Sequence, residues 1–186
     1  PKRGLCTNEL IHEIYFLSIL FDTCLILAGG RGTRLAPYTD KTHKSLIEIN
    51  GSKFIEYIIE HLNFYGISNI VILTGYLSYQ FEEIEKKYKH KRGISVRTFH
   101  SDVELNTCQR VYLARNYLEG DVLICYGDVF TEVNLTEYYN FYKSFKDCFC
   151  SINALSRHNK ITKLELENNQ IKPKNIYKDI GFFAIN

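Results

Sequence analysis

Residues 24–28 read CLILA and lead directly into residues 29–34, which read GGRGTR. The apolar run predicts a buried strand, and three glycines follow it within four residues. Glycine allows positive φ angles and leaves no Cβ between the backbone amides and a ligand. Amides that point into such a gap can hold phosphate oxygens, and Arg31 and Arg34 add positive charge and bidentate donors. The stretch therefore predicts a turn that holds the phosphates of a nucleotide.

The glycine spacing separates this turn from two common phosphate-binding loops. A dinucleotide fingerprint would carry a third glycine where Leu35 stands, and a Walker loop would end in Gly-Lys-Thr or Gly-Lys-Ser. A dehydrogenase of the Rossmann type would also place an acidic residue after the second strand, where residues 74–76 read TGY. The alternative without a ligand is a tight turn that carries two surface arginines.

Outward from the turn, short apolar runs alternate with amphipathic segments, as expected for strands and helices around a parallel sheet. We expect strands at residues 24–28, 69–74, 94–99, 122–126, 148–155, 161–166 and 180–185. We expect helices at residues 53–65, 107–118 and 134–145, and one that begins at Ser78 as its N-cap. The run at residues 122–126 is apolar throughout, which places it near the centre of the sheet. The predicted fold is α/β, a Rossmann-like three-layer sandwich with a mostly parallel mixed sheet.

No repeat, low-complexity tract or proline-rich linker divides residues 23–186, which we interpret as one domain. Residues 1–22 are interpreted as a helical extension of unknown role. Its apolar part, residues 10–21, contains His12 and Glu13 and is too short to span a bilayer. The extension therefore predicts no membrane anchor.

The composition narrows the partners and the compartment. The formal net charge is +2, which gives no field strong enough to favour nucleic acid or an anionic membrane. The six cysteines form no CxxC pair and no zinc-finger spacing, so they predict reduced thiols in a cytoplasmic protein. The sequence leaves open whether the chain forms homo-oligomers.

A second candidate site follows the strand predicted at residues 122–126. Gly127 and Asp128 stand directly after this run, and the carboxyl ends of strands in an open parallel sheet face the ligand crevice. A carboxylate at this place can hold Mg²⁺ against the α-phosphate of a nucleotide. The alternative is a Gly-Asp turn without a metal.

The glycine turn and the residues after it resemble the signature of the sugar-1-phosphate nucleotidylyltransferase family. Residues 27–35 read LAGGRGTRL, Pro37 and Thr39 follow, and residues 44–46 read KSL, which is similar to the pattern GGxGTRLxPxTxxxPKxL. The resemblance covers about residues 23–155. It implies the nucleotide-diphospho-sugar transferase type of the fold predicted above.

The resemblance also implies roles for individual residues. Arg34 and Lys44 would hold the triphosphate and the incoming sugar phosphate across the reacting phosphorus, and Asp128 would bind Mg²⁺ as the cofactor. Nucleotidyl transfer requires mainly in-line positioning and neutralisation of phosphate charge. The nucleotide-binding candidates are Leu27, Ala28, Gly29, Gly30, Arg31, Gly32, Thr33, Thr107 and Gly127. His43 stands where the family has proline, and a histidine can keep the course of the loop while losing its rigidity.

Other segments resemble subgroups of the family. Residues 105–111 lie where glucose-1-phosphate cytidylyltransferases carry T-G-G-R-L, with Cys108 and Gln109 in place of the two glycines. Larger side chains would narrow the pocket, so either the specificity differs or the site is damaged. Residues 54–76 resemble heptose- and mannose-1-phosphate guanylyltransferases about as well, and choline-phosphate cytidylyltransferases are a further relative. The base therefore stays open.

The last residues of the chain resemble a strand of the family. Residues 181–186 read GFFAIN, which is similar to GGFFVLN, and the family continues beyond this strand with a second metal-binding aspartate. We therefore expect the domain to be truncated at its C-terminus. The family's Glu-Lys-Pro, whose lysine binds the sugar phosphate, has a counterpart at Lys172 and Pro173. Lys172 is a sugar-phosphate candidate, and the alternative is a solvated turn lysine.

Together these features predict an Mg²⁺-dependent enzyme that joins a sugar 1-phosphate to the α-phosphate of a nucleoside triphosphate and releases pyrophosphate. The product would be an NDP-sugar for cell-surface polysaccharide synthesis. The expected partners are the triphosphate and the sugar 1-phosphate, without nucleic acid or membrane. The alternative is an inactive nucleotide-binding remnant or a regulatory homologue of the same fold, which His43, Cys108 and Gln109 favour.

Overall fold

The computed structural model describes residues 20–130, 133–144, 150–152, 164–167, 170–173 and 182–185. The helical extension expected at residues 1–22 lies outside the described residues, apart from Leu20 to Asp22. Leu20 and Phe21 are buried in the core. The last residues before the first strand thus pack with the domain.

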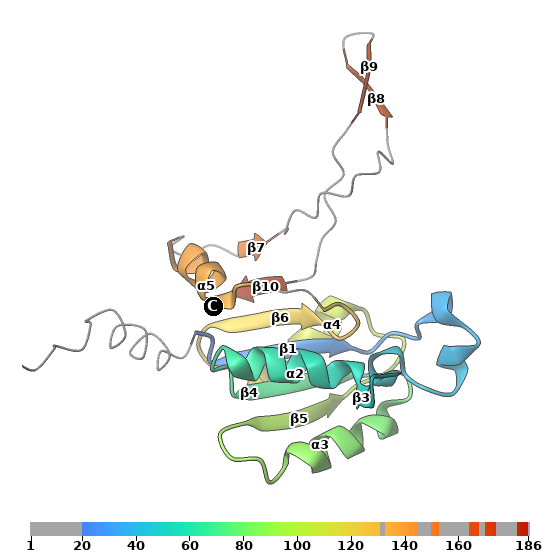
Figure 1. Cartoon of the computed structure of the whole chain (residues 1–186), viewed down its shortest axis with the longest axis vertical. Coiled ribbons are helices and arrows are strands. Elements are labelled where there is room, and N and C mark those ends of the chain that lie inside the picture. The colour runs from blue at the N-terminus through green and yellow to red at the C-terminus, as the bar shows by residue number, and fades with distance from the viewer. Residues whose placement is uncertain are drawn as a thin grey trace, which may run out of the picture.

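A six-stranded sheet forms the centre of the molecule. Its strands are β1 (Thr23–Ala28), β4 (Asn69–Thr74), β5 (Ser95–His100), β6 (Val122–Tyr126), β7 (Cys150–Ile152) and β10 (Phe182–Ile185), in the order β5-β4-β1-β6-β10-β7. The first four in this order are parallel, and β10 runs antiparallel to both β6 and β7. Figure 1 shows β1, β4, β5 and β6 pointing to the same side of the molecule. The predicted mixed, mostly parallel sheet and the central place of β6 are confirmed.

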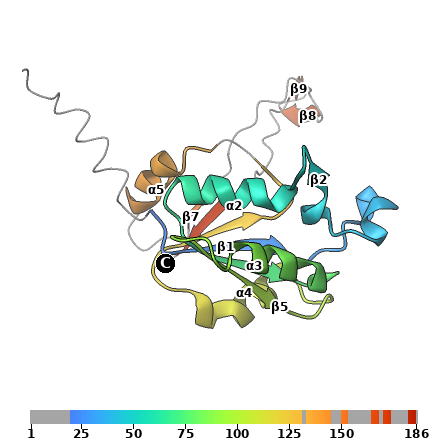
Figure 2. The same ribbon diagram turned by 60° about the horizontal axis from the view of Figure 1, so that its bottom comes forward.

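Helices cover both faces of this sheet. The apolar sides of α2 (Phe54–Phe64), α3 (Glu82–Tyr88) and α5 (Leu135–Ser144) pack on one face, together with inward residues such as Ile26 and Ile72. The other face packs against α4 (Thr107–Leu113) and the 3₁₀ turn Ala114–Tyr117 that continues it. Figure 2 shows α2 and α4 on opposite sides of the strands. The three-layer α/β sandwich is confirmed.

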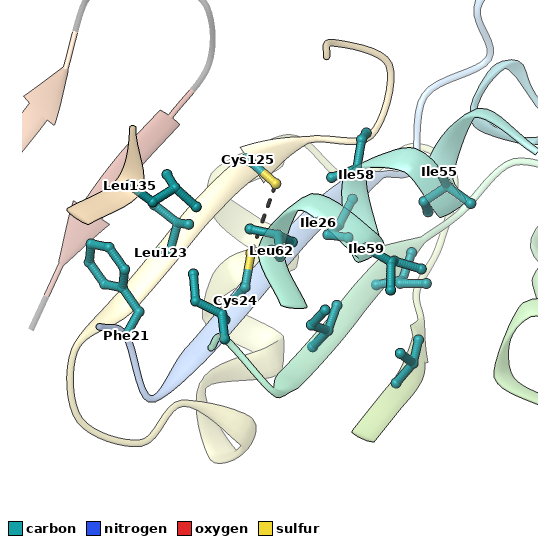
Figure 3. Packing of buried hydrophobic residues seen from close by; sticks show 14 of the residues in the cluster. Phe21, Cys24, Ile26, Ile55, Ile58, Ile59, Leu62, Leu123, Cys125 and Leu135 are labelled. Atoms are coloured by element: carbon teal, nitrogen blue, oxygen red, sulfur yellow. Dashed lines mark hydrogen bonds between the residues drawn. The ribbon is translucent and has the colours of Figure 1, made fainter. Parts of the chain in front are cut away.

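The core beneath α2 is built of buried apolar side chains. Figure 3 shows Cys24 of β1 and Cys125 of β6 turned toward each other under this helix, beside Ile26, Ile58 and Leu62. Their sulfur atoms are 3.9 Å apart, and burial raises the pKa of the Cys24 thiol well above its ordinary value. Both side chains are free thiols that act as small apolar groups here.

The aspartate before β6 fixes the start of the sheet to α5. The Asp121 carboxylate accepts hydrogen bonds from the hydroxyl groups of Tyr139 and Tyr142, both at 2.9 Å, and from Lys143 at 2.7 Å. Phe21 packs edge-on to Tyr139 with ring centroids 5.0 Å apart and is completely buried. These contacts hold the entry to β1 against α5, at the end of the sheet opposite the glycine turn.

Some predicted elements end elsewhere. The helix expected at residues 107–118 stops at Leu113, where the Ala114 amide donates to the carbonyls of both Arg110 and Tyr112, and the 3₁₀ turn Ala114–Tyr117 follows it. Ser78 is not an N-cap, because it opens a 3₁₀ turn that precedes α3 and begins after Leu77, whose φ is 49°. That prediction was wrong.

The C-terminal strand predictions are matched in part. β7 and β10 fall within two of the predicted ranges, and β8 (Leu164–Glu167) overlaps the third. β8 pairs with β9 (Gln170–Pro173) in a separate antiparallel two-stranded sheet. A further short hairpin joins β2 (Glu48–Ile49) to β3 (Ser52–Lys53) just before α2.

Candidate active site

The glycine turn and Asp128 lie at the place where the strand order reverses. From β1 the chain proceeds to β4 and β5 on one side of the sheet and then returns to β6 on the other side of β1. In open α/β sheets, ligands bind in the crevice beyond the carboxyl ends of the strands at such a switch point. Residues 29–34 follow β1 and residues 127–128 follow β6, so both border this crevice (Figure 1).

The glycine turn leaves β1 and opens to solvent. Gly32 has a φ of 67°, which suits glycine, and caps the 3₁₀ turn Thr33–Leu35. The Thr39 hydroxyl donates to the Gly32 carbonyl at 3.0 Å and ties the turn to the segment that follows it. Arg34 is exposed in this 3₁₀ turn. The turn therefore offers exposed backbone and a guanidinium to an anion.

Lys44 and Asp128 form an ion pair across the crevice. The Lys44 ammonium donates to an Asp128 carboxylate oxygen at 2.5 Å, although the two residues are 84 positions apart in the sequence. The side chains are 19% and 32% exposed, so the pair is open to solvent and to ligands. The lysine and the carboxylate that the sequence singled out separately thus share one site, beside the glycine turn.

Gly127 joins the two loops of the crevice. Its amide donates to the carbonyl of Leu27 at 2.9 Å and so continues the pairing of β6 with β1 by one residue. A Cβ on Gly127 would lie 3.0 Å from the Ser45 hydroxyl oxygen and 3.1 Å from the Leu27 carbonyl oxygen. The close packing holds Asp128 against the turn that carries Lys44, while Ala28 is buried at the end of β1.

His43 is completely buried directly before Lys44. Its backbone is extended, with φ −61° and ψ 137°, and its Nδ1 accepts a hydrogen bond from the Ser45 amide at 3.2 Å. Burial, and then the neighbouring Lys44 charge, lower the pKa of His43 to about 4, while the Gly30 backbone and Asp128 act in the opposite direction. The imidazole is therefore neutral near pH 7 and caps the 3₁₀ turn Lys44–Leu46.

Arg110 is a residue of the site that the sequence analysis did not single out. Its side chain is buried, with 5% of the residue exposed, and burial lowers its pKa. The guanidinium donates to the carbonyls of Thr74, Val103 and Leu105 and to the Ser101 hydroxyl, at 2.7 to 3.2 Å. It thereby joins the loops that follow β4 and β5.

The position of the Arg110 guanidinium explains why residues 29 and 75 are glycines. A Cβ on Gly29 or on Gly75 would lie 2.1 Å from an Arg110 nitrogen, so a side chain at either position would displace the guanidinium. Glycine at these positions lets the guanidinium pack directly on the backbone at the ends of β1 and β4. An arginine in a helix resembles any solvated residue in sequence, so only the T-G-G-R-L resemblance, whose arginine falls on Arg110, could have drawn attention to it.

Thr107 is the first residue of α4 and is exposed. The N-cap before it is Asn106, whose side chain accepts from the Gln109 amide at 2.9 Å, while the Gln109 side chain accepts from the Asn106 amide at 2.9 Å. This reciprocal capping box gives Gln109 a structural task at a position where the resembled subgroup has glycine. Cys108 is exposed beside it.

Arg31 does not extend freely into the crevice. Its guanidinium donates to Glu104 at 2.8 Å and lies 5.5 Å from the centre of the Tyr76 ring. The ion pair is solvent-exposed, and such pairs contribute little to stability. Arg31 is therefore placed at the rim, where it links the glycine turn to the loop before α4.

Lys172 lies on β9, in register with Glu165 of β8, rather than in a turn. Among the described residues there is no group of three or more His, Cys, Asp or Glu side chains that could hold a metal ion. Asp128 supplies a single carboxylate at the crevice.

The matched family fits this architecture. The family described as nucleotidyl transferase matches residues 23–160. The chain belongs to the nucleotidyl transferase family. The match covers the glycine turn, Lys44 and Asp128, and it confirms the resemblance inferred from the sequence. No helix in the described part of this family member has the length and apolar character needed to cross a membrane.

The relatives of this nucleotidyl transferase are named for different phosphate esters. The chain is 38% identical over 102 residues to the choline-phosphate cytidylyltransferase of Streptococcus pneumoniae, a match that covers 54% of this chain and 42% of that protein. It is 34% identical over 124 residues to the mannose-1-phosphate guanyltransferase of Saccharomyces cerevisiae, covering 64% of this chain and 34% of that protein. The chain spans 26% to 52% of the length of curated relatives from bacteria, archaea and yeast.

Solved structures share the fold. The CTP:phosphocholine cytidylyltransferase of Streptococcus pneumoniae superposes with a TM-score of 0.50 at 34% identity, over 60% of this chain and 47% of that one. The inositol-1-phosphate CTP transferase of T. maritima superposes with a TM-score of 0.62 over 91% of this chain and 72% of that one, at 19% identity. The second likeness supports the fold alone.

Proposed function

We propose that the chain provides the catalytic centre of a nucleotidylyltransferase, which joins a phosphate monoester to the α-phosphate of a nucleoside triphosphate and releases pyrophosphate. The observation that carries this proposal is the Lys44–Asp128 ion pair, set beside the glycine turn at the switch point of the sheet. A cation, a carboxylate and exposed backbone amides in one crevice are the groups that such a transfer needs.

Asp128 fits a magnesium ion. Mg²⁺ is commonly held by one or two carboxylates together with substrate phosphates and water, so a single half-exposed carboxylate is a sufficient protein ligand. The bound ion would neutralise phosphate charge next to the reacting phosphorus. Asp128 would then exchange its contact with Lys44 for the metal, which leaves the Lys44 ammonium free to hold a phosphate oxygen.

The other residues of the crevice position the substrates. The exposed Arg34 offers a bidentate contact to the triphosphate, and the backbone of Gly29, Gly30, Gly32 and Thr33 lines the path of its phosphates. Leu27 and Ala28 fix the start of the turn, and Gly127 fixes Asp128. Lys172 is proposed as a ligand of the incoming phosphate, and Thr107 as a contact of the nucleoside.

We further propose a sugar 1-phosphate as acceptor and an NDP-sugar as product, used in the cytoplasm for polysaccharide synthesis. The names of the relatives add choline phosphate as a second acceptor class and CTP as the first triphosphate to try. Sugar 1-phosphates and choline phosphate share a phosphate monoester, which is the group that attacks the α-phosphate.

The test is release of pyrophosphate over four triphosphates with Mg²⁺, each paired with several sugar 1-phosphates and with choline phosphate. We expect one pair to turn over, and we expect Lys44→Ala and Asp128→Asn each to reduce kcat/KM by a factor of about 100 or more. Lys89→Ala, a substitution of an exposed residue at the C-terminal end of α3, serves as the matched control. Turnover that survives both active-site substitutions would refute the proposal.

The same panel addresses the alternative of a remnant without turnover. A remnant would bind a triphosphate, giving a rise in Tm with Mg²⁺ and nucleotide, and would release no pyrophosphate with any pair. Robust release with any pair excludes it.

A further inference from the structure

The turn that carries Lys44 is held from outside by a side chain that the proposed mechanism does not use. We propose that Gln80 and His43 are positioning residues, which fix this turn so that Lys44 meets the triphosphate. The inference rests on the proposed function, because it requires that Lys44 contacts phosphate. It adds the residues that decide where the lysine stands.

Gln80 binds the turn at two points. Its side-chain oxygen accepts from the His43 amide at 2.8 Å, and its side-chain nitrogen donates to the Lys41 carbonyl at 2.7 Å. One primary amide thus pairs with residues 41 and 43 as a neighbouring strand would. Gln80 belongs to the 3₁₀ turn Ser78–Phe81 that follows β4, so it connects this loop to the loop that bears Lys44.

The His43 imidazole holds the turn from inside. Because Nδ1 accepts from the Ser45 amide, the neutral ring carries its hydrogen on Nε2. The ring is fully buried, packs edge-on to Phe81 with centroids 4.8 Å apart and lies against the Gly30 backbone. The imidazole therefore connects the lysine turn to the glycine turn, immediately before the residue that must reach the phosphates.

The backbone of His43 shows how this arrangement can be tested. Its φ of −61° lies in the range that a proline ring fixes covalently, and its ψ of 137° is extended. Proline at this position would hold the same conformation through its ring, and it has no amide hydrogen for Gln80 to accept. In a His43→Pro background, Gln80 should consequently become dispensable.

A cavity of about 820 Å³ borders the turn, which makes Gln80 a practical target for substitution. Thr42, Leu46 and Gln80 are among the residues that line it. Substitution of the partly exposed Gln80 leaves the main core untouched. Thr42→Ala, an exposed change within the same turn, is the matched control.

The experiment measures the Kd of Mg²⁺ complexes of the four nucleoside triphosphates by titration calorimetry. Lys44→Ala should weaken binding at least tenfold, and Gln80→Leu should weaken it about tenfold, as expected for a misplaced charge-assisted hydrogen bond. Gln80→Glu keeps the acceptor for His43 and loses the donor to Lys41, so it should cause a smaller loss. Thr42→Ala should bind as the unmodified chain does.

Two double variants separate positioning from a general structural effect. Gln80→Leu should have less than about a twofold effect in the His43→Pro background and none in the Lys44→Ala background. A tenfold loss in either background would overturn the inference, as would unchanged binding by Gln80→Leu when Lys44→Ala is impaired. Unchanged binding by Lys44→Ala itself would instead refute the role of Lys44 in the proposed function, and the positioning role with it.

Discussion

Arg110 and Gly29 offer the sharpest test of how the crevice is built. The Arg110 guanidinium occupies the space where a Gly29 side chain would be, since a Cβ there would lie 2.1 Å from Nη1 and 2.5 Å from Cζ. Gly29→Ala must therefore expel the guanidinium from its carbonyl partners. Arg110→Ala removes the guanidinium and empties that space. The two substitutions should thus damage the same contacts.

The magnitude follows from the partners of Arg110. The Thr74 carbonyl keeps hydrogen bonds from the Ser101 amide and hydroxyl, whereas Arg110 is the donor that the structure gives to the carbonyls of Val103 and Leu105. Two charge-assisted hydrogen bonds of about 1.5 kcal/mol each make Arg110→Ala destabilising by about 3 kcal/mol. Gly29→Ala should cost about as much, because it disrupts the same two bonds.

Urea unfolding of the single and double variants gives the coupling. If the sites share their contacts, the double variant should lose about 3 kcal/mol, and if they were independent it would lose about 6 kcal/mol. Gly75→Ala is the control, because its Cβ would also lie 2.8 Å from the Gly29 carbonyl oxygen, which Arg110→Ala cannot relieve. Additive losses at Gly29, or equal rescue at Gly75, would refute this account of the glycines.

Three further predictions concern stability. Asp121→Asn should lower the free energy of unfolding by about 1 to 3 kcal/mol in urea. Burial acts to raise the pKa of the Asp121 carboxyl, but the hydrogen bonds from Lys143, Tyr142 and Tyr139 outweigh burial and lower this pKa. The stabilisation by the Asp121 carboxylate is therefore complete above the pKa of the unfolded chain, about 4, and is lost as the pH falls below it. Because the pKa of His43 is about 4 in the folded protein and about 6.5 in the unfolded chain, the unfolded chain binds a proton on His43 more readily between these two values. The free energy of unfolding should therefore fall by up to about 3 kcal/mol as the pH is lowered from about 6.5 to about 4. The fall should be smaller in His43→Gln. Phe21→Ala should cost about 3 to 5 kcal/mol, because the ring is completely buried among tyrosines.

For each of these three predictions, one result would contradict the structural reason given for it. An Asp121→Asn variant as stable as the parent at pH 7 would show that the hydrogen bonds from the tyrosine hydroxyls to residue 121 do not depend on its negative charge. Equal pH slopes for the parent and His43→Gln would mean that His43 is not held neutral. A loss below 1 kcal/mol for Phe21→Ala would place residues 20–22 outside the cooperative core.

The strands were predictable because parallel strands buried on both faces are continuous apolar runs. The ranges expected at residues 69–74 and 122–126 coincide with β4 and β6, and β1 differs by one residue. Helix ends were less predictable, since they depend on individual hydrogen bonds. The expected start of α4 at Thr107 agrees with the structure, where the Asn106–Gln109 capping box fixes it, but the helix ends early at Leu113, where the Ala114 amide donates to two carbonyls.

Some residues of the candidate site could likewise be predicted from the sequence, and others could not. The glycine turn and the Gly-Asp after β6 could be found from local sequence, because a strand end followed by glycine is itself a local signal. Arg110 and Gln80 could not, because their partners are backbone groups on loops that are distant in sequence: 36 residues separate Arg110 from Thr74, and 37 separate Gln80 from His43. A side chain that binds carbonyls leaves no partner pattern in the sequence.

Two residues, His43 and Gln109, depart from the signatures that the sequence resembles, and the structure gives both of them hydrogen-bond partners. His43 replaces a proline, yet it keeps a proline-like φ and adds hydrogen bonds on both sides of the turn. Gln109 replaces a glycine, yet its side chain points back to cap α4 and so is engaged at the helix start. Because both residues are bonded into the loops that frame the crevice, these substitutions favour an adapted site over a decayed one, and the pyrophosphate-release panel is the measurement on which that reading depends.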